Sequence, residues 1–201
     1  MTTRIQLVDE ESRKKTMKKN IIKILGKRTV WEGKFLRCLL TTYIDSQGVS
    51  REWESFERVN CKGIVAIVPV TDDKKVLLIR QFRPPVCGYV IEFPAGLNDR
   101  EDTLEEAARR ELLEETGYSA REMIYLTEGP LSSGASGEIL TVFLAKGLEF
   151  KGIGKRDETE DIEVLKIPIA DLYHELSALR SGGNYIDLKI FGLIELAKKH
   201  L

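Results

Sequence analysis

"AGLNDREDTLEEAARRELLEETGY", Ala95 to Tyr118, crowds acidic residues toward the end of one predicted helix. Thr103 and Glu106 have the spacing of a capping box, in which each side chain bonds the backbone of the other. Gly117 is a typical helix stop, because glycine adopts the left-handed conformation without steric cost. The sequence therefore predicts a helix that starts at Thr103 and ends before Gly117.

Three glutamates of this helix, Glu111, Glu114 and Glu115, should project together, because positions three and four apart share a helix face. Carboxylates this close repel one another. A hard divalent cation such as Mg²⁺ takes oxygen ligands and is usually shared with substrate phosphates, so it would turn the repulsion into coordination. The alternative is a solvated helix face on which Arg110 pairs with the glutamates around it. The strand, loop and helix context favours the metal site.

Composition narrows the classes of partner. The chain has 201 residues, 42% hydrophobic and 31% charged, which is enough for one core and a small second lobe. Its net charge of −1 gives no electrostatic reason to expect a nucleic-acid or membrane partner. No apolar run approaches the ~20 residues that cross a bilayer, and the N-terminus lacks the apolar core of a signal peptide, so we expect a cytoplasmic protein. The chain has only three cysteines and two histidines, too few for a typical sulfur or histidine metal site, so any metal is expected to be bound by oxygen ligands.

The order of the elements indicates a small N-terminal arm and β lobe over residues 1–60, followed by a mixed α/β domain over 61–201. Aromatic and β-branched residues after Ile21 predict strands, and "DSQG" at Asp45 to Gly48 predicts a hairpin turn. Amphipathic spacing after Ala170 predicts C-terminal helices. Short apolar runs predict the strands of a buried mixed sheet at 63–70, 76–82, 89–93, 121–129, 138–148 and 162–169.

The stretch from Gly96 to Tyr118 resembles the Nudix box, G-x5-E-x7-R-E-U-x-E-E-x-G-U with U apolar. The fixed positions match at Gly96, Arg110-Glu111-Leu112, Glu114-Glu115 and Gly117-Tyr118, and only the first box glutamate differs, as Asp102. The resemblance implies a Nudix α/β/α sandwich with a mixed β-sheet in the 61–201 domain. It also implies hydrolysis of a nucleoside diphosphate linked to another moiety.

By matching positions, the resemblance implies that Glu111, Glu114 and Glu115 bind Mg²⁺ or Mn²⁺ with the backbone carbonyl of Ala95. Arg110 would orient these glutamates. The ion would neutralise the diphosphate and lower the pKa of a water that attacks phosphorus. Asp102 falls outside this ligand set, so activity is expected to survive the change.

Two flanking segments, "RQFRPPVCGYVIEFPAGL" (80–97) and "REWESFERV" (51–59), resemble the ADP-ribose and nucleotide-sugar pyrophosphatase branch. In that branch the N-terminal lobe is exchanged or packed between two subunits, so a homodimer is implied. Trp53 and Phe35 would stack the nucleobase, and Arg58 and Arg83 would meet the diphosphate or the base. Trp53 could instead be a core or interface residue, and Arg58 a surface arginine without a role.

The general base is implied to be a glutamate in the loop after the box, where Glu160 matches best and Glu158 next. The alternative for this segment is a solvated charge run. Glu92 and Glu138 are further candidates for substrate contacts. Where the branch carries Pro in an "SPG" motif, this chain has Ser133, which favours nucleotide sugars other than ADP-ribose.

The sequence thus predicts a Mg²⁺-dependent hydrolase that splits ADP-ribose or a related nucleotide sugar into a nucleoside monophosphate and a sugar phosphate. One alternative is a hydrolase specific for a hexose conjugate such as GDP-mannose or ADP-glucose. Another is a sensor that binds ADP-ribose without cleaving it.

Overall fold

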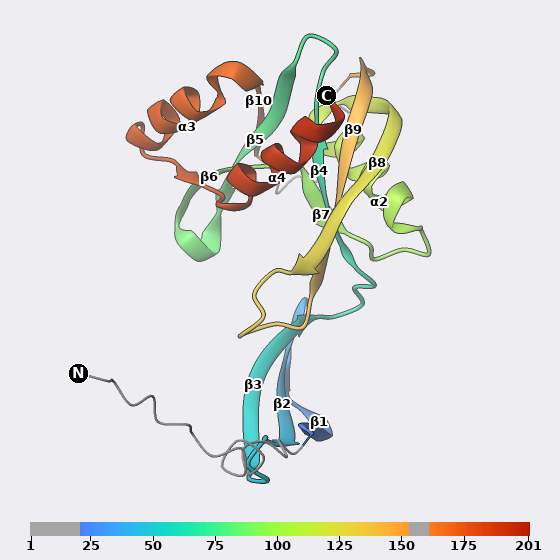
Figure 1. The fold of residues 1–201 in the computed structure, drawn as a ribbon, viewed down its shortest axis with the longest axis vertical. Helices are drawn as coiled ribbons and strands as arrows, with labels where there is room; N and C mark the ends of the chain where they lie inside the picture. Colours follow the sequence, from blue (N-terminus) through green and yellow to red (C-terminus); the bar gives the residue numbers. More distant parts are fainter. Residues whose placement is uncertain (1–20, 153–160) are drawn as a thin grey trace, which may run out of the picture. The chain divides into compact units, whose positions relative to one another are not determined.

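A computed structural model describes residues 21–152 and 161–201 of the chain (Figure 1). The chain divides into two compact units, Met1–Val59 and Asn60–Leu201, and each is described by itself. Across both described ranges, no helix has the length and apolar character needed to span a membrane.

The first unit contains a three-stranded antiparallel sheet of β1 (Lys23–Glu32), β2 (Leu36–Ile44) and β3 (Ser50–Arg58). The predicted hairpin turn joins β2 to β3. The Asp45 carboxylate accepts the backbone N–H groups of Gln47 and Val49, and Gly48 has a φ of 82°. A short acidic side chain and a glycine therefore close the turn as the sequence predicted.

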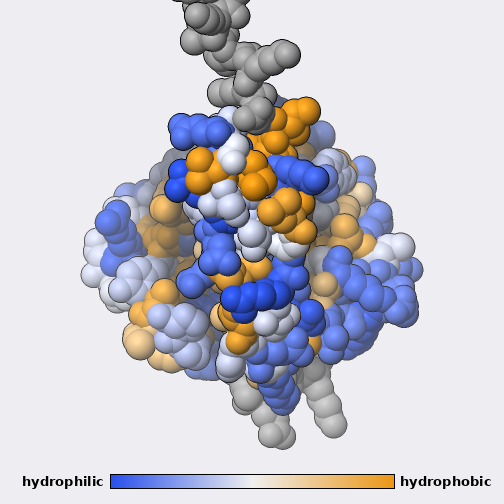
Figure 2. All heavy atoms as spheres, turned by 90° about the horizontal axis from the view of Figure 1, so that it is seen from below, coloured by the Kyte–Doolittle hydropathy of each residue, from blue (hydrophilic) through white to orange (hydrophobic). Residues whose placement is uncertain are grey.

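This sheet buries little apolar surface. From Ile21 to Val59 the buried hydrophobic residues are Leu39 and Leu40, whereas Trp31 is 58% exposed and every residue of β1 is exposed. Figure 2 shows hydrophobic residues lying at the molecular surface between hydrophilic ones. A sheet of this size needs a packed apolar face to be stable, so a further surface is expected to cover it.

The second unit holds two four-stranded sheets, in the orders β10-β5-β6-β11 and β7-β4-β9-β8. The β4–β9 and β6–β11 pairs are parallel and the others are antiparallel. Its elements are β4 (Ile64–Pro69), β5 (Lys75–Arg83), β6 (Gly88–Glu92), β7 (Ala95–Leu97), α2 (Leu104–Thr116), β8 (Tyr118–Pro130), β9 (Ile139–Phe150), β10 (Ile162–Pro168), α3 (Leu172–Ser181), β11 (Tyr185–Ile186) and α4 (Lys189–Ala197), with short 3-10 turns at Pro84–Val86, Ile169–Asp171 and Lys198–His200.

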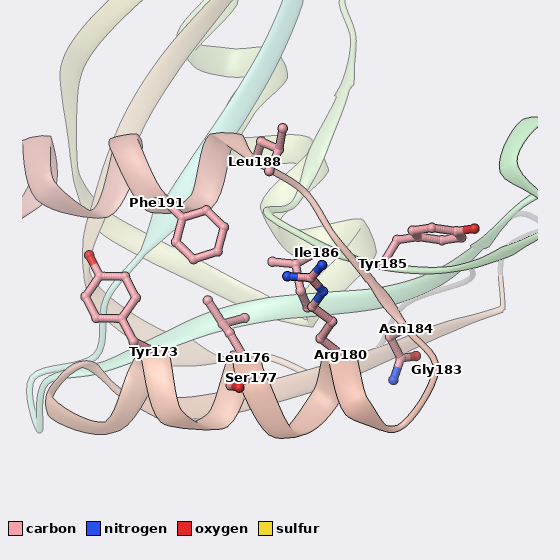
Figure 3. A pocket seen from close by; sticks show the side chains of 10 residues that line it. All are labelled: Tyr173, Leu176, Ser177, Arg180, Gly183, Asn184, Tyr185, Ile186, Leu188 and Phe191. Atoms are coloured by element: carbon pink, nitrogen blue, oxygen red, sulfur yellow. The ribbon is translucent and has the colours of Figure 1, made fainter.

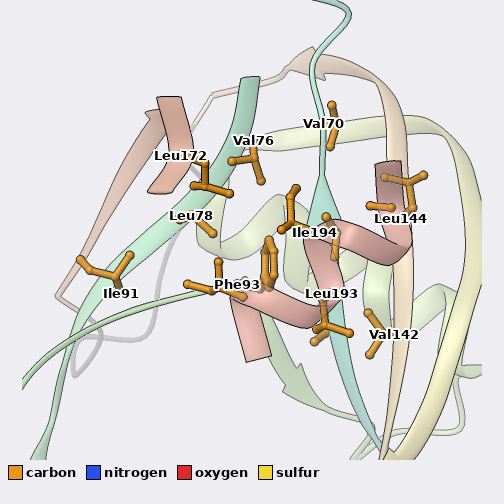
Figure 4. Packing of buried hydrophobic residues seen from close by; sticks show 14 of the residues in the cluster. Val70, Val76, Leu78, Ile91, Phe93, Val142, Leu144, Leu172, Leu193 and Ile194 are labelled. Atoms are coloured by element: carbon orange, nitrogen blue, oxygen red, sulfur yellow. The ribbon is translucent and has the colours of Figure 1, made fainter. Parts of the chain in front are cut away.

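Strand β4 is buried along its whole length and shows how the layers are built. Alternate side chains of a strand point to opposite faces. Ile64, Ala66 and Val68 join the apolar cluster that contains the buried faces of α3 and α4. Val65 and Ile67 join a second cluster with α2. The fold is therefore the α/β/α sandwich with mixed strands that the sequence predicted, with α2 on one face and α3 and α4 on the other (Figures 1 and 4).

Two short strands were not predicted. β7 has three residues and pairs with β4, and β11 has two residues and pairs with β6. Segments this short carry no periodicity of their own, so only the partner strand makes them strands.

Candidate active site

Helix α2 is fixed at both ends by local interactions. The Thr103 hydroxyl accepts the N–H of Glu106 at 3.2 Å, and the Glu106 carboxylate accepts the N–H of Thr103 at 2.8 Å. Gly117 ends the helix with a φ of 78°. The predicted capping box and glycine stop are confirmed, with Thr103 as the cap and Leu104 as the first helical residue. These ends set which side chains of α2 face β7.

Arg110 gathers the acidic side chains of the box. Its Nη1 donates to Glu111 at 2.6 Å and to Glu114 at 3.3 Å, and its Nη2 donates to the carbonyl of Leu97 on β7 at 3.1 Å. Burial lowers the pKa of the Arg110 guanidinium, but the two carboxylates outweigh burial and raise the pKa above its ordinary value. Arg110 therefore stays charged and holds Glu111 and Glu114 beside the strand.

Glu115 and Glu111 reach the backbone of β7 at neighbouring residues. Glu115 is 4% exposed, and its carboxylate accepts the N–H of Ala95 at 2.9 Å. A Cβ atom on Gly96 would lie well inside van der Waals contact with the Glu111 carboxyl group. The absence of a side chain at Gly96 therefore creates the cradle that the Glu111 carboxylate fills.

These side chains fit a hard divalent cation in the chemistry of their oxygen donors and in the cradle at Gly96. Within residues 21–152 and 161–201, no group of three or more His, Cys, Asp or Glu side chains is arranged to hold a metal ion. In this arrangement Arg110 donates to Glu111 and Glu114, and the N–H of Ala95 donates to Glu115. The structure thus brings the predicted metal-binding residues to one place without showing their coordination.

The loop between β7 and α2 contains a residue that the sequence analysis missed. Asn98 is 3% exposed, and its side chain donates to the carbonyl of Asp102 at 2.7 Å. This bond braces the turn that leads into the capping box. An asparagine in a short loop is a common turn residue, but its burial could not be read from the sequence.

Asp102, the residue that departs from the box, lies beside Arg110. Its Oδ2 is 3.5 Å from Arg110 Nε, and that buried Nε has no hydrogen-bond partner among the described residues. Since a glutamate is one methylene longer, Asp102→Glu should reach this nitrogen. We expect it to raise the free energy of unfolding by about 1 kcal/mol, measured by urea denaturation. The matched control is Asp99→Glu, because the Asp99 side chain is 60% exposed and its carboxylate lies 3.9 Å from Arg110 Nη2. Equal effects of the two substitutions would contradict the prediction.

Arg83 and Glu92 form an ion pair on adjacent strands β5 and β6. Arg83 Nε and Nη2 each lie 2.7 Å from Glu92 Oε1. Burial raises the pKa of the Glu92 carboxyl above its ordinary value, and the positive charge of Arg83 opposes that rise. Two of the predicted substrate-binding residues are therefore paired with each other in the structure.

The remaining predicted site residues lie in other parts of the chain. Glu138 precedes β9, and its N–H donates to the Ser136 hydroxyl at 3.0 Å. Trp53, Phe35 and Arg58 belong to the Met1–Val59 unit, where the two aromatic side chains are exposed. Glu158 and Glu160 lie outside the described residues.

Most of the chain is similar to known proteins. Residues 62–186 match the model of the NUDIX domain. The ADP-sugar pyrophosphatase of Mus musculus is 32% identical over 192 residues, which cover 88% of this chain and 87% of the mouse protein. The ADP-ribose pyrophosphatase of Bacillus subtilis (strain 168) is 33% identical over 151 residues, which cover 74% of this chain and 80% of the bacterial protein. A crystal structure of an ADP compounds hydrolase aligns with a TM-score of 0.68 at 27% identity, covering 79% of this chain and 86% of that one.

Proposed function

The chain belongs to the NUDIX domain family, and from that membership we propose that it is a pyrophosphohydrolase of ADP-ribose or a related nucleoside diphosphate sugar. The products would be a nucleoside monophosphate and a sugar phosphate. The observation that carries the proposal is the arrangement of α2 against β7, in which Arg110 and two backbone positions collect three glutamates.

The metal-binding part of the site is assigned to Glu111, Glu114, Glu115 and the carbonyl of Ala95. Mg²⁺, or Mn²⁺ in its place, would supply neutralisation of the diphosphate charge and activation of a water molecule when bound there. Arg110 pairs with both Glu111 and Glu114, which lowers the free-energy cost of bringing their like charges together. The glutamates would therefore be held in position before the substrate binds.

Substrate contacts are assigned to the remaining predicted residues. Arg83 presents a guanidinium that suits a phosphate oxygen or a base edge, and Glu92 fixes its direction through the ion pair. Trp53 and Phe35 offer exposed rings on which a nucleobase can stack. Arg58 and Glu138 complete the proposed contact set. Glu160, or Glu158 beside it, is the proposed base that takes the proton of the attacking water.

A substrate panel tests the function. We would incubate the protein and Mg²⁺ with ADP-ribose, ADP-glucose, UDP-glucose, GDP-mannose and a dinucleoside polyphosphate, and measure the monophosphate released. ADP-ribose turnover supports the leading proposal. Preference for a hexose conjugate supports the second candidate, which Ser133 favours. Tight binding of ADP-ribose without turnover of any compound would contradict hydrolysis and indicate a sensor.

A homodimer is the proposed assembly. Trp31 and Trp53 of the β1–β3 sheet, and Phe35 in the turn between β1 and β2, are more than half exposed, and a second copy would cover such a surface. We expect sedimentation equilibrium to give twice the mass of one chain, and Trp31→Ser to lower that mass toward one. The control is Tyr125→Ser, which removes a similarly exposed ring from β8. A monomeric wild-type protein would rule the assembly out.

A further inference from the structure

A cavity of about 600 Å³ lies among α3, β11 and α4, in the helical layer on the opposite face of the sandwich from α2 (Figure 3). Of the described residues that are assigned to hydrolysis, none lines it. Its volume falls in the range of cavities that bind small molecules. The cavity therefore needs an explanation separate from the proposed reaction.

Aromatic side chains form much of its wall. The rings of Tyr173 and Phe191 lie nearly parallel, 9° apart with centroids 6.0 Å apart, and Tyr185 stands at the other end of the cavity (Figure 3). Leu188, at the mouth, is 81% exposed. Flat apolar walls favour a ligand with a planar ring body, because ring contacts add to the free energy of burying apolar area.

Arg180 is the one cationic side chain among the described residues that line the cavity. Nearby carboxylates are already engaged: Glu195 accepts from Lys198 at 2.7 Å and from the Tyr173 hydroxyl at 2.6 Å, and Asp187 pairs with Lys189 at 2.5 Å. Within the described parts of the chain, the Arg180 guanidinium makes no ion pair and donates no hydrogen bond. The cavity therefore carries one positive charge that its own walls do not neutralise, which favours an anionic ligand.

The wall that carries Tyr185 is braced by the sheet. The Asn184 amide accepts from Arg80 Nε at 2.8 Å and donates to the carbonyl of Leu179 at 2.9 Å. Tyr185 itself pairs with Val90 in the parallel β11–β6 ladder. A wall tied to both α3 and β6 is already formed before binding, which lowers the entropic cost of taking up a ligand.

We propose that this cavity binds a small aromatic anion. The planar ring system would lie against Tyr173, Tyr185 and Phe191, and a single carboxylate, sulfonate or phosphate group would meet Arg180. Such a site is separate from substrate turnover and would be occupied by a second molecule.

The probe for the test is 8-anilinonaphthalene-1-sulfonate, an aromatic monoanion whose fluorescence rises in apolar surroundings. N-phenyl-1-naphthylamine, which lacks the sulfonate, is the uncharged counterpart. We expect Arg180→Gln to weaken binding of the sulfonate roughly three- to tenfold, the range for one partly exposed charged hydrogen bond, and to leave the uncharged probe unaffected. Arg180→Lys should retain most of the affinity. Arg121→Gln, another exposed arginine on β8, is the control.

A second variant separates this cavity from other apolar surfaces. Leu188→Glu places a carboxylate at the mouth and should weaken the sulfonate more than the uncharged probe, since only the sulfonate is repelled. Unchanged affinity of the sulfonate in both Arg180→Gln and Leu188→Glu would overturn the proposal, because the dye would then bind elsewhere. A fall in sedimented mass in Leu188→Glu would also overturn it, since the cavity would then be an interface between subunits.

Discussion

Turnover of ADP-ribose should fall by at least about a hundredfold in Glu115→Gln, the loss expected when a charged group that serves the transition state is removed. Glutamine keeps the shape of glutamate, and its amide oxygen can still accept the N–H of Ala95, so the bond between α2 and β7 survives. Only the negative charge is lost. We therefore expect kcat to fall while the melting temperature stays close to that of the wild type.

The matched control is Glu105→Gln, on the same helix. Glu105 pairs with Arg109 at 2.9 Å and its side chain is 49% exposed, so its loss removes an exposed ion pair and no proposed ligand. We expect wild-type kcat and KM in this variant. Titration with Mn²⁺ followed by electron paramagnetic resonance gives a second measurement, and Glu115→Gln should bind the ion more weakly. Wild-type turnover and ion affinity in Glu115→Gln would remove the role that we assign to this carboxylate.

The parts of the site that could be predicted from the sequence depend on local signals. Thr103, Glu106 and Gly117 are sufficient to set the ends of α2, because each acts on backbone groups within four residues. With the ends fixed, helical geometry places Glu111, Glu114 and Glu115. The alternation along β4 similarly follows from strand geometry, although which helix covers each face depends on the tertiary fold.

The parts that could not be predicted depend on contacts between distant segments. In the β5–β6 ladder Glu92 lies opposite Ile79, so its ion pair with Arg83 spans several residues along the strands and does not follow from sequence spacing. Strand β11 exists only through its pairing with β6, and it supplies one wall of the cavity near Arg180. The burial of Asn98 likewise follows from packing that no local pattern records.

Gly96→Ala should lower turnover while leaving stability close to that of the wild type. The new Cβ atom would overlap the Glu111 carboxyl group, which is the far end of a flexible side chain, so Glu111 can move away without disturbing the backbone. Alanine also restricts the unfolded chain, and we expect the free energy of unfolding to stay within about 1 kcal/mol of the wild type. A displaced catalytic group loses activity steeply, so kcat should fall roughly 10- to 100-fold.

The control for the backbone change is Gly129→Ala on β8, where an added Cβ atom meets no atom of the described residues within 4 Å. It should leave both turnover and stability close to wild type. The cause of the loss at Gly96 can be tested in a Glu111→Asp background, because aspartate is shorter and withdraws from the added methyl group. If the overlap is the cause, Gly96→Ala costs less in that background than in the wild type, and the two substitutions are not additive. Additive losses would show that Gly96 acts through the backbone of β7 and would contradict the cradle as the reason for a glycine at this position.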